Sequence, residues 1–311
     1  MKTKKLICSL LASMLVLLSL SACQPAKPGQ TETTSSAQSS DIYHIEDYES
    51  SEVFDIAKVN LSEALSDICT SSRFTYLSDG LKINGYISVP NSLAATQKPG
   101  KCVLFNRGGN RDFGKLENDT TANICAVCGR IVVASQYRGG GGSEGADQFG
   151  GDDLHDVIKL IDLCENHFSF IDMDDFCAAG ASRGGVMTYP VARQDKRIKR
   201  IIALSAESDL FEAYESRDDM KTVLKETIGC TPDENPEEYK KRSAVYWADE
   251  IEVPVLMFHS RQDKRVSYKQ AEDLYAKLKD STDCTFITYE DDSHAIVHDK
   301  DYSTIRNWLN Q

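Results

Sequence analysis

The 311-residue sequence predicts an α/β fold with a mostly parallel central sheet that is covered by helices on both faces. Two observations carry this prediction. Short β-type runs alternate with segments in which apolar residues recur at helical spacing. Ile201–Ser205 and Val255–His259 are also apolar, as expected of strands that a parallel sheet buries on both faces. Repeated strand–helix units of this kind build a doubly covered sheet.

An antiparallel hairpin is predicted to open the sheet. Phe74–Leu77 and Leu81–Val89 are β-type runs, and they flank the turn sequence Ser78-Asp79-Gly80. The strands expected after the hairpin are 102–105, 131–135, 176–179, 201–205, 255–259 and 285–289. The helices expected between and after them are 118–128, 152–164, 186–192, 267–278 and 302–309. Residues 207–250 interrupt this order with charged helical sequence, which we expect to form an insertion that caps a strand end.

The first 22 residues predict a bacterial signal peptide. Three lysines precede an apolar run at 6–20 that is too short to span a bilayer comfortably. The run ends in Leu20-Ser21-Ala22-Cys23, which resembles the lipobox of lipoproteins. We therefore expect lipidation of Cys23 and an extracytoplasmic protein that is anchored to the bacterial membrane. The alternative is an ordinary cleaved signal peptide with an incidental cysteine.

The remaining chain divides by composition. Residues 23–40 would be the lipidated cysteine and a polar tether, which has too little apolar surface to offset the entropy of ordering. Residues 41–73 are interpreted as an N-terminal extension, and residues 74–311 as the main α/β domain, with the helical insertion at 207–250.

Several classes of function are disfavoured. Loss of the signal peptide removes three lysines and no acid, which takes the net charge from −13 to −16 and disfavours nucleic-acid binding. Gly140–Gly145 matches a dinucleotide-binding pattern, but the next helix begins too late to hold a pyrophosphate. Cys125 and Cys128 lack a second metal-binding pair, so buried free thiols are favoured, while disulfide, redox and metal roles stay open. We expect no nucleic-acid partner, nucleotide, metal or other cofactor.

Ser182 has the sequence context of a catalytic nucleophile. It lies in G-A-S-R-G, between a predicted strand and a predicted helix. A tight strand–serine–helix turn exposes the hydroxyl and requires small neighbours, here Gly180 and Gly184. The same turn places the N–H of Arg183 at a helix N-terminus, where it could bind an oxyanion.

Acyl transfer by serine also needs a histidine base and a carboxylate that orients it. Asp263 follows the strand 255–259, and His294 follows the strand 285–289. The three residue types thus appear after three strands, in the order serine, acid, histidine. His298 and His259 are the rival bases, although His259 ends a strand and is more consistent with support of the Asp263 loop.

A second oxyanion donor is expected in the glycine-containing loop 106–110, which follows the strand 102–105. Glycine lets the backbone approach a substrate closely, so the N–H of Gly108 is assigned to this role.

Together these motifs resemble the catalytic domain of the prolyl oligopeptidase family of serine peptidases, within the α/β-hydrolase fold. The opening hairpin, the loop 106–110 and Tyr137-Arg138-Gly139 occur in the family's order. So do the double-glycine elbow around Ser182 and the pattern P-x4-H-G-x2-D-x2-V-x3-Q from Pro254 to Gln270, in which Ser260 replaces the glycine. The resemblance spans roughly residues 74–310.

The resemblance implies a serine hydrolase that acts on short peptides or acylated amino acids. Residues 41–73 are too few for the propeller of long family members, so we expect the catalytic domain alone. Arg107 departs from the tyrosine or histidine that relatives carry there, and Arg107 and Tyr137 are candidate substrate contacts. Carboxylic ester hydrolysis by the same triad remains an alternative, and a non-catalytic solute-binding lipoprotein is a minor one.

Overall fold

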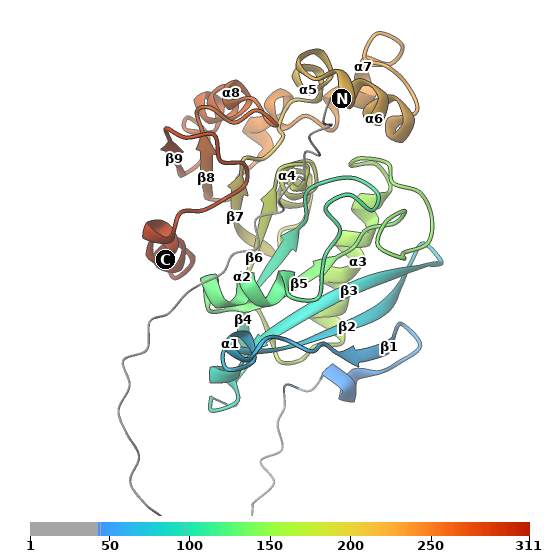
Figure 1. The fold of residues 1–311 in the computed structure, drawn as a ribbon, viewed down its shortest axis with the longest axis vertical. Coiled ribbons are helices and arrows are strands. Elements are labelled where there is room, and N and C mark those ends of the chain that lie inside the picture. The colour runs from blue at the N-terminus through green and yellow to red at the C-terminus, as the bar shows by residue number, and fades with distance from the viewer. Residues whose placement is uncertain (1–42, 44, 97) are drawn as a thin grey trace, which may run out of the picture. The chain divides into compact units, whose positions relative to one another are not determined.

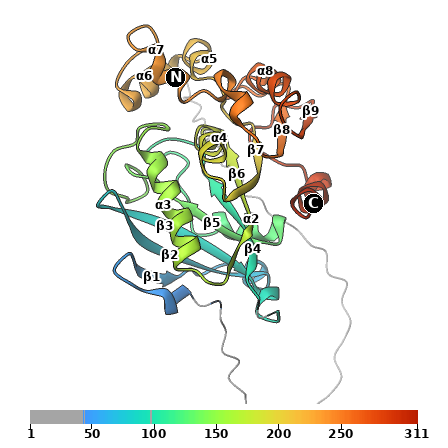
Figure 2. The same cartoon turned by 180° about the vertical axis from the view of Figure 1, so that it is seen from behind.

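The protein is described by a computed structural model that covers residue 43, residues 45–96 and residues 98–311. The predicted signal peptide, Cys23 and the tether lie outside these residues. The described residues form one compact unit around a nine-stranded sheet (Figures 1 and 2). Across the same ranges, no helix combines the length and apolar character that a membrane span requires.

The elements follow the predicted alternation. The strands are β1 (Val53–Lys58), β2 (Cys69–Ser78), β3 (Leu81–Pro90), β4 (Gly100–Asn106), β5 (Ile131–Ser135), β6 (Ile171–Ala181), β7 (Ile198–Leu204), β8 (Val255–Ser260) and β9 (Cys284–Tyr289). The α-helices are α1 (Glu63–Ser66), α2 (Thr120–Cys128), α3 (Asp153–Asn166), α4 (Gly184–Gln194), α5 (Leu210–Ser216), α6 (Asp218–Ile228), α7 (Pro236–Lys240), α8 (Tyr268–Leu278) and α9 (Tyr302–Leu309). Short 3₁₀ helices are η1 (Ile45–Tyr48), η2 (Asn91–Leu93), η3 (Ala244–Tyr246), η4 (Ala248–Glu250) and η5 (Asp299–Asp301).

The strand order is β1-β2-β3-β5-β4-β6-β7-β8-β9. Strands β5, β4, β6, β7, β8 and β9 are parallel to one another, whereas the β1–β2, β2–β3 and β3–β5 pairs are antiparallel. The predicted hairpin is confirmed, because β2 and β3 pair through to Ser78 and Leu81. The mostly parallel α/β fold is confirmed with it.

The N-terminal extension is part of the sheet. Strand β1 pairs with β2, and β2 already begins at Cys69, so the boundary predicted at residue 74 falls inside a strand. The sequence did not predict β1 because VFDIAK is an edge strand. Only its first residue, Val53, is fully buried, and it carries two charged residues instead of a continuous apolar run.

Two apolar cores lie on opposite faces of the sheet. Cys102 and Leu104 of β4 face a core shared with α3, α4 and α8, while Val103 and Phe105 face a core shared with α2 and α9. This alternation is the two-residue period of a strand. Six of the eight free cysteines in the described chain are buried, Cys125 and Cys128 among them, as the sequence favoured.

The predicted helical insertion is present between β7 and β8. Its helices α5, α6 and α7 lie together beyond the end of the sheet at which β7 finishes (Figures 1 and 2). They enclose a third apolar cluster that includes Leu210, Leu224 and Tyr239. Phe149 and Val186 belong to the same cluster, so the insertion is packed onto the chain that surrounds Ser182.

Candidate active site

The parallel strands bring the candidate residues to one edge of the sheet. Asn106 of β4 pairs with Gly180 of β6, and Ala181 pairs with Leu204 of β7. The carboxyl ends of these strands therefore align, as do those of β8 and β9. The chain places β5 on one side of β4 and β6 on the other. In open α/β sheets, ligands bind in the crevice at such a reversal of strand order.

Ser182 occupies a strained turn between β6 and α4. Its φ is +56°, a conformation that costs a non-glycine residue on the order of 1–3 kcal/mol and is held here by surrounding structure. Its N–H donates to the Leu204 carbonyl at 3.0 Å. A Cβ on Gly180 would collide with the carbonyl of Gly184, and one on Gly184 would collide with Asn106. The small neighbours that the sequence pointed to are therefore required by lack of space.

Two backbone N–H groups lie beside Ser182 without a partner in the described chain. Arg183 is the N-cap of α4. Gly108 packs on the elbow, since a Cβ there would be 3.2 Å from the Cβ of Ser182 and 3.0 Å from the Ala181 carbonyl. Neither N–H donates to another described residue. Both N–H groups therefore have unused donor capacity within the described residues.

Asp263 and His294 are joined by a hydrogen bond. Nδ1 of His294 lies 2.8 Å from Oδ2 of Asp263, whose carboxylate is fully buried. Oδ1 accepts from the N–H groups of Arg265 at 2.8 Å and Val266 at 3.2 Å. Burial opposes ionisation, but His294 and these N–H groups outweigh it and lower the pKa of Asp263. Asp263 can therefore hold the imidazole as a carboxylate.

The two rival histidines have their shortest polar contacts with other residues, although Nε2 of His259 also lies 3.5 Å from Oδ2 of Asp263. Nε2 of His298 lies 3.0 Å from Asp291, and its ring stacks on Tyr289 with 3.8 Å between centroids. His259 is buried and donates from Nε2 to the Val266 carbonyl at 2.9 Å. Burial lowers the pKa of His259. It braces the loop that carries Asp263, as its place at a strand end indicated.

Ser260 links the acid loop to the histidine loop. Its Oγ donates to Oδ1 of Asp291 at 3.0 Å and lies 2.6 Å from Oγ of Ser293, the residue before His294. The glycine of the family pattern has no side chain for these bonds. The replacement noted in the sequence therefore supports the segment that positions His294.

Arg107 and Tyr137 are buried beneath the loop that carries Gly108. The Arg107 guanidinium donates to the carbonyls of Gln136 at 3.0 Å, Gly108 at 3.0 Å and Arg111 at 2.9 Å. It also packs over the Tyr137 ring, 5.1 Å from its centroid, and that ring is fully buried. Both residues were predicted to contact the substrate, and the structure instead gives their buried side chains partners inside the protein.

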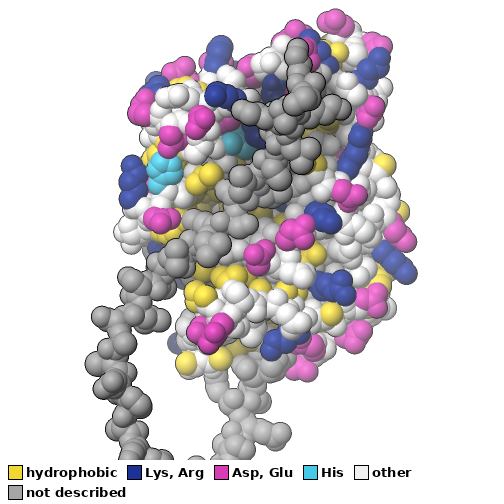
Figure 3. Space-filling view, viewed as in Figure 1, with side chains coloured by type: hydrophobic (Ala, Val, Ile, Leu, Met, Phe, Trp, Pro, Cys, Tyr) yellow, Lys and Arg dark blue, Asp and Glu magenta, His cyan; other side chains and the backbone are white. Residues whose placement is uncertain are grey.

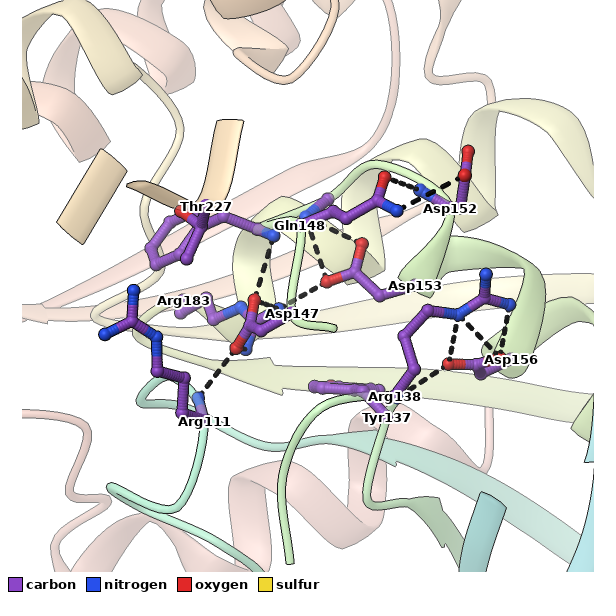
Figure 4. Close-up of polar contacts among 12 residues, drawn as sticks. Arg111, Tyr137, Arg138, Asp147, Gln148, Asp152, Asp153, Asp156, Arg183 and Thr227 are labelled. Atoms are coloured by element: carbon purple, nitrogen blue, oxygen red, sulfur yellow. Dashed lines mark hydrogen bonds and ion pairs between the residues drawn. The ribbon is translucent and has the colours of Figure 1, made fainter. Parts of the chain in front are cut away.

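The Arg183 side chain is held in a cluster of paired charges that the sequence did not reveal (Figure 4). Its guanidinium donates to both oxygens of Asp147 at 2.8 Å and to Asp153 at 2.5 Å. It lies between the rings of Tyr137 and Phe149, about 5 Å from each centroid. Asp147 also accepts from the N–H of Arg111 at 2.7 Å. The cluster thus fixes the residue that follows the nucleophile.

A second buried pair extends this cluster toward the hairpin (Figure 4). Arg138 donates to Asp156 at 2.7 Å from Nη2 and at 3.1 Å from Nε, and it donates to Asp79 of the hairpin turn at 2.8 Å. In the sequence, the acidic residues at the start of the helix predicted from residue 152 were the only indication of such a pair.

The insertion borders the site. Arg111 pairs with Glu226 of α6 at 2.7 Å, and Arg217, between α5 and α6, donates to the Arg265 carbonyl at 2.9 Å. Arg265 lies 5.7 Å from the ring of Phe113, which is exposed. On the visible face, acidic and basic side chains are interspersed outside the grey atoms (Figure 3). The insertion is therefore in contact with the loop that follows β4 and with the loop that carries Asp263.

Comparison with known proteins identifies the family of this chain. Residues 117–311 match the model of the prolyl oligopeptidase family. An uncharacterized peptidase of Bacillus subtilis, YtmA, is 31% identical over 207 residues, which cover 66% of this chain and 77% of the relative. Dipeptidyl-peptidase 5 of Aspergillus oryzae is 25% identical over 256 residues, but these are 77% of this chain and 35% of that protein.

The fold has solved counterparts. The structure of an acylaminoacyl peptidase in complex with Z-Gly-Gly-Phe-chloromethyl ketone superposes with a TM-score of 0.67 at 22% identity. The match covers 78% of this chain and 42% of that one, so the chain spans less than half of the solved protein. By its sequence match and its α/β-hydrolase architecture, the chain belongs to the prolyl oligopeptidase family of serine-type peptidases.

Proposed function

We propose that the protein is a serine hydrolase in which Ser182, His294 and Asp263 form a catalytic triad. The Asp263–His294 hydrogen bond of 2.8 Å, at the sheet edge where Ser182 occupies its strained turn, is the observation that carries the proposal. A buried carboxylate that holds Nδ1 leaves Nε2 of the imidazole to act on the serine.

In the proposed reaction, His294 removes the proton of Ser182 as its Oγ attacks the substrate carbonyl carbon. The tetrahedral oxyanion accepts hydrogen bonds from the N–H groups of Arg183 and Gly108. His294 then donates the proton to the leaving group, and an acyl-enzyme remains on Ser182. Water, deprotonated by His294, attacks the acyl carbon and releases the acid and the free serine.

The proposed substrates are short peptides or acylated amino acids. The names of the relatives support amide chemistry, since they are a peptidase, a dipeptidyl-peptidase and an acylaminoacyl peptidase. Carboxylic esters are the second candidate, because the same triad and oxyanion donors serve both reactions. In either case Arg107 and Tyr137 would support the loop that carries Gly108 rather than contact the substrate.

Matched substrates test the proposal and separate its two forms. An N-acyl amino acid p-nitroanilide and the corresponding p-nitrophenyl ester would be compared by kcat/KM. Peptidase function predicts saturable hydrolysis of the anilide, and both activities should disappear in Ser182→Ala. Hydrolysis of the ester alone would indicate an esterase, and activity that survives in Ser182→Ala would contradict the triad.

We further propose that Cys23 carries a lipid anchor that holds the enzyme on the outer side of the bacterial cell membrane. The lipobox-like sequence before Cys23 and the polar tether after it support this placement. Cell fractionation tests it: the natural protein should sediment with membranes, and Cys23→Ser should be released or retained as an unprocessed precursor. Equal membrane association and processing of both proteins would contradict lipidation.

A further inference from the structure

Glu207 is a buried acid beside the nucleophile that the triad does not use. It follows β7, and its N–H donates to the carbonyl of Ser182 at 2.9 Å. A Cβ on Gly185 would be 2.7 Å from the Glu207 carbonyl, so the residue packs directly on the start of α4. Glu207 is 2% exposed, and its Oε2 has no hydrogen-bond partner within the described chain.

The charged groups around Glu207 are bonded to others. Arg217 between α5 and α6 and Arg183 at the N-cap of α4 favour its ionisation, while Glu212 on α5 and Asp219 on α6 oppose it. Arg183 donates to Asp147 and Asp153, and Arg217 pairs with Asp219 at 2.5 Å. Neither arginine forms a hydrogen bond to Glu207. The carboxyl, at the first residue of the insertion and beside the elbow, therefore lacks a counter-ion of its own.

A buried carboxyl in this state favours a cationic ligand. Burial raises the pKa of Glu207 to about 7, because a desolvated charge without a partner is costly. A cation that enters beside it would supply both a counter-ion and hydrogen-bond donors, and ionisation would then be favoured. An apolar ligand would leave the acid without a partner. The backbone contact of Glu207 with Ser182 places the residue itself next to the nucleophile turn.

We propose that Glu207 is a specificity residue that binds a cationic group of the substrate next to the scissile bond. This inference rests on the proposed serine hydrolase function. The group recognised is an ammonium or guanidinium. It belongs either to a lysine or arginine side chain or to the free α-amine of the residue whose carbonyl is attacked.

Three activated esters distinguish these sources and do not require amide hydrolysis. They are the p-nitrophenyl esters of N-acetyl-lysine, with a charged side chain, of leucine, with a free α-amine, and of N-acetyl-leucine, with neither. At least one charged ester should exceed the neutral one in kcat/KM, and the better of the two identifies the source. In Glu207→Gln that ratio should fall by about 10-fold to 100-fold, as expected when a charge-assisted hydrogen bond is lost.

Fluorophosphonate titration of Ser182 would normalise each rate to folded, active enzyme. Glu215→Gln is the matched control, because Glu215 is exposed on α5 and its loss changes the net charge equally. This control should keep the ratio of the natural enzyme. A natural enzyme that labels at Ser182 but shows no preference for a charged ester would overturn the inference alone. The same holds for a Glu207→Gln variant that keeps the preference. A natural enzyme that does not label would overturn the proposed function as well.

Discussion

The two sides of the nucleophile turn treat buried acids in opposite ways. On one side, Asp147 and Asp153 pair with Arg183 at 2.8 and 2.5 Å. On the other side, Glu207 is also buried, but its Oε2 has no hydrogen-bond partner within the described chain. Both sides touch the same turn, so the difference does not come from depth in the protein.

We attribute the difference to function: the paired acids hold Arg183 in place, and the unpaired Glu207 is proposed to bind the substrate. Burying a charge is costly unless it is paired, and the paired side meets this requirement within the chain. It thereby fixes Arg183, whose N–H is a proposed oxyanion donor. On the unpaired side, nothing offsets the cost of burying an ionised Glu207 until a ligand supplies a cation. Four substitutions test this contrast, from the largest expected effect to the smallest.

Asp263→Asn removes the paired acid that is closest to the proposed chemistry. An amide can hold the imidazole in the wrong tautomer, so kcat should fall by about 10⁴-fold while the fold is kept. Steady-state kinetics on the preferred substrate would measure this fall. Asp292→Asn is the control, because Asp292 is exposed and lies 3.9 Å from Lys264. A loss of tenfold or less in Asp263→Asn would contradict the assignment of the acid.

Asp147→Asn breaks the paired side itself. The Arg183 guanidinium would keep its burial but lose a bidentate partner, which should lower the free energy of unfolding by about 3–5 kcal/mol. Urea denaturation measures this value. Asp152→Asn, an exposed neighbour on the same segment, should change it by less than about 0.5 kcal/mol. Similar values for the two variants would mean that the buried pairs do not stabilise the turn.

Glu207→Gln, on the unpaired side, should change the free energy of unfolding in the direction opposite to Asp147→Asn. The pKa of Glu207 is raised from 4.5 to about 7 on folding, so the folded protein keeps its proton over a range in which the unfolded chain has lost it. Stability of the natural protein therefore falls as pH rises from about 4.5 to about 7 and then levels off. The shift corresponds to about 3 kcal/mol at most.

The glutamine variant lacks this titration. It should therefore gain stability relative to the natural protein at pH 8 and show little gain at pH 4.5. Denaturant unfolding at the two pH values measures the difference. A gain that does not depend on pH, or a loss at pH 8, would show that Glu207 is paired in solution and would remove the contrast between the two sides.

Glu226→Gln gives the smallest expected effect. Its ion pair with Arg111 is about half exposed on both partners, so solvent screens it, and its loss should cost less than about 1 kcal/mol. Thermal unfolding at low and high salt measures this cost, which should shrink further at high salt. A loss as large as that in Asp147→Asn would mean that exposed and buried pairs contribute alike.

The sequence predicted the elements that carry the site. The strands before Ser182, Asp263 and His294 are short apolar runs, and such runs are visible without knowledge of tertiary contacts. Ser182, Asp263 and His294 come after these strands in the order serine, acid, histidine, which can be read directly from the sequence. Strand β1 was missed because an edge strand shows no such run.

The sequence did not predict which side chains would pair with one another. Arg183 and Asp147 are separated by 36 positions, and their contact depends on how the loop before α3 folds over the elbow. Glu207 looked like one more acid in a charged insertion, because nothing in Ala206-Glu207-Ser208 indicates burial. Arg107 was expected to contact substrate from its position alone. In the structure its buried guanidinium donates to three carbonyl groups of two different segments, which the sequence did not indicate.

Covalent labelling tests the central claim most directly. The folded protein would be treated with a fluorophosphonate, digested and analysed by mass spectrometry, with Ser182→Ala as the control. The account predicts one adduct per chain on the peptide that contains Ser182, and none in the variant. A folded protein that stays unmodified, or that carries the adduct on another residue, would contradict Ser182 as the nucleophile.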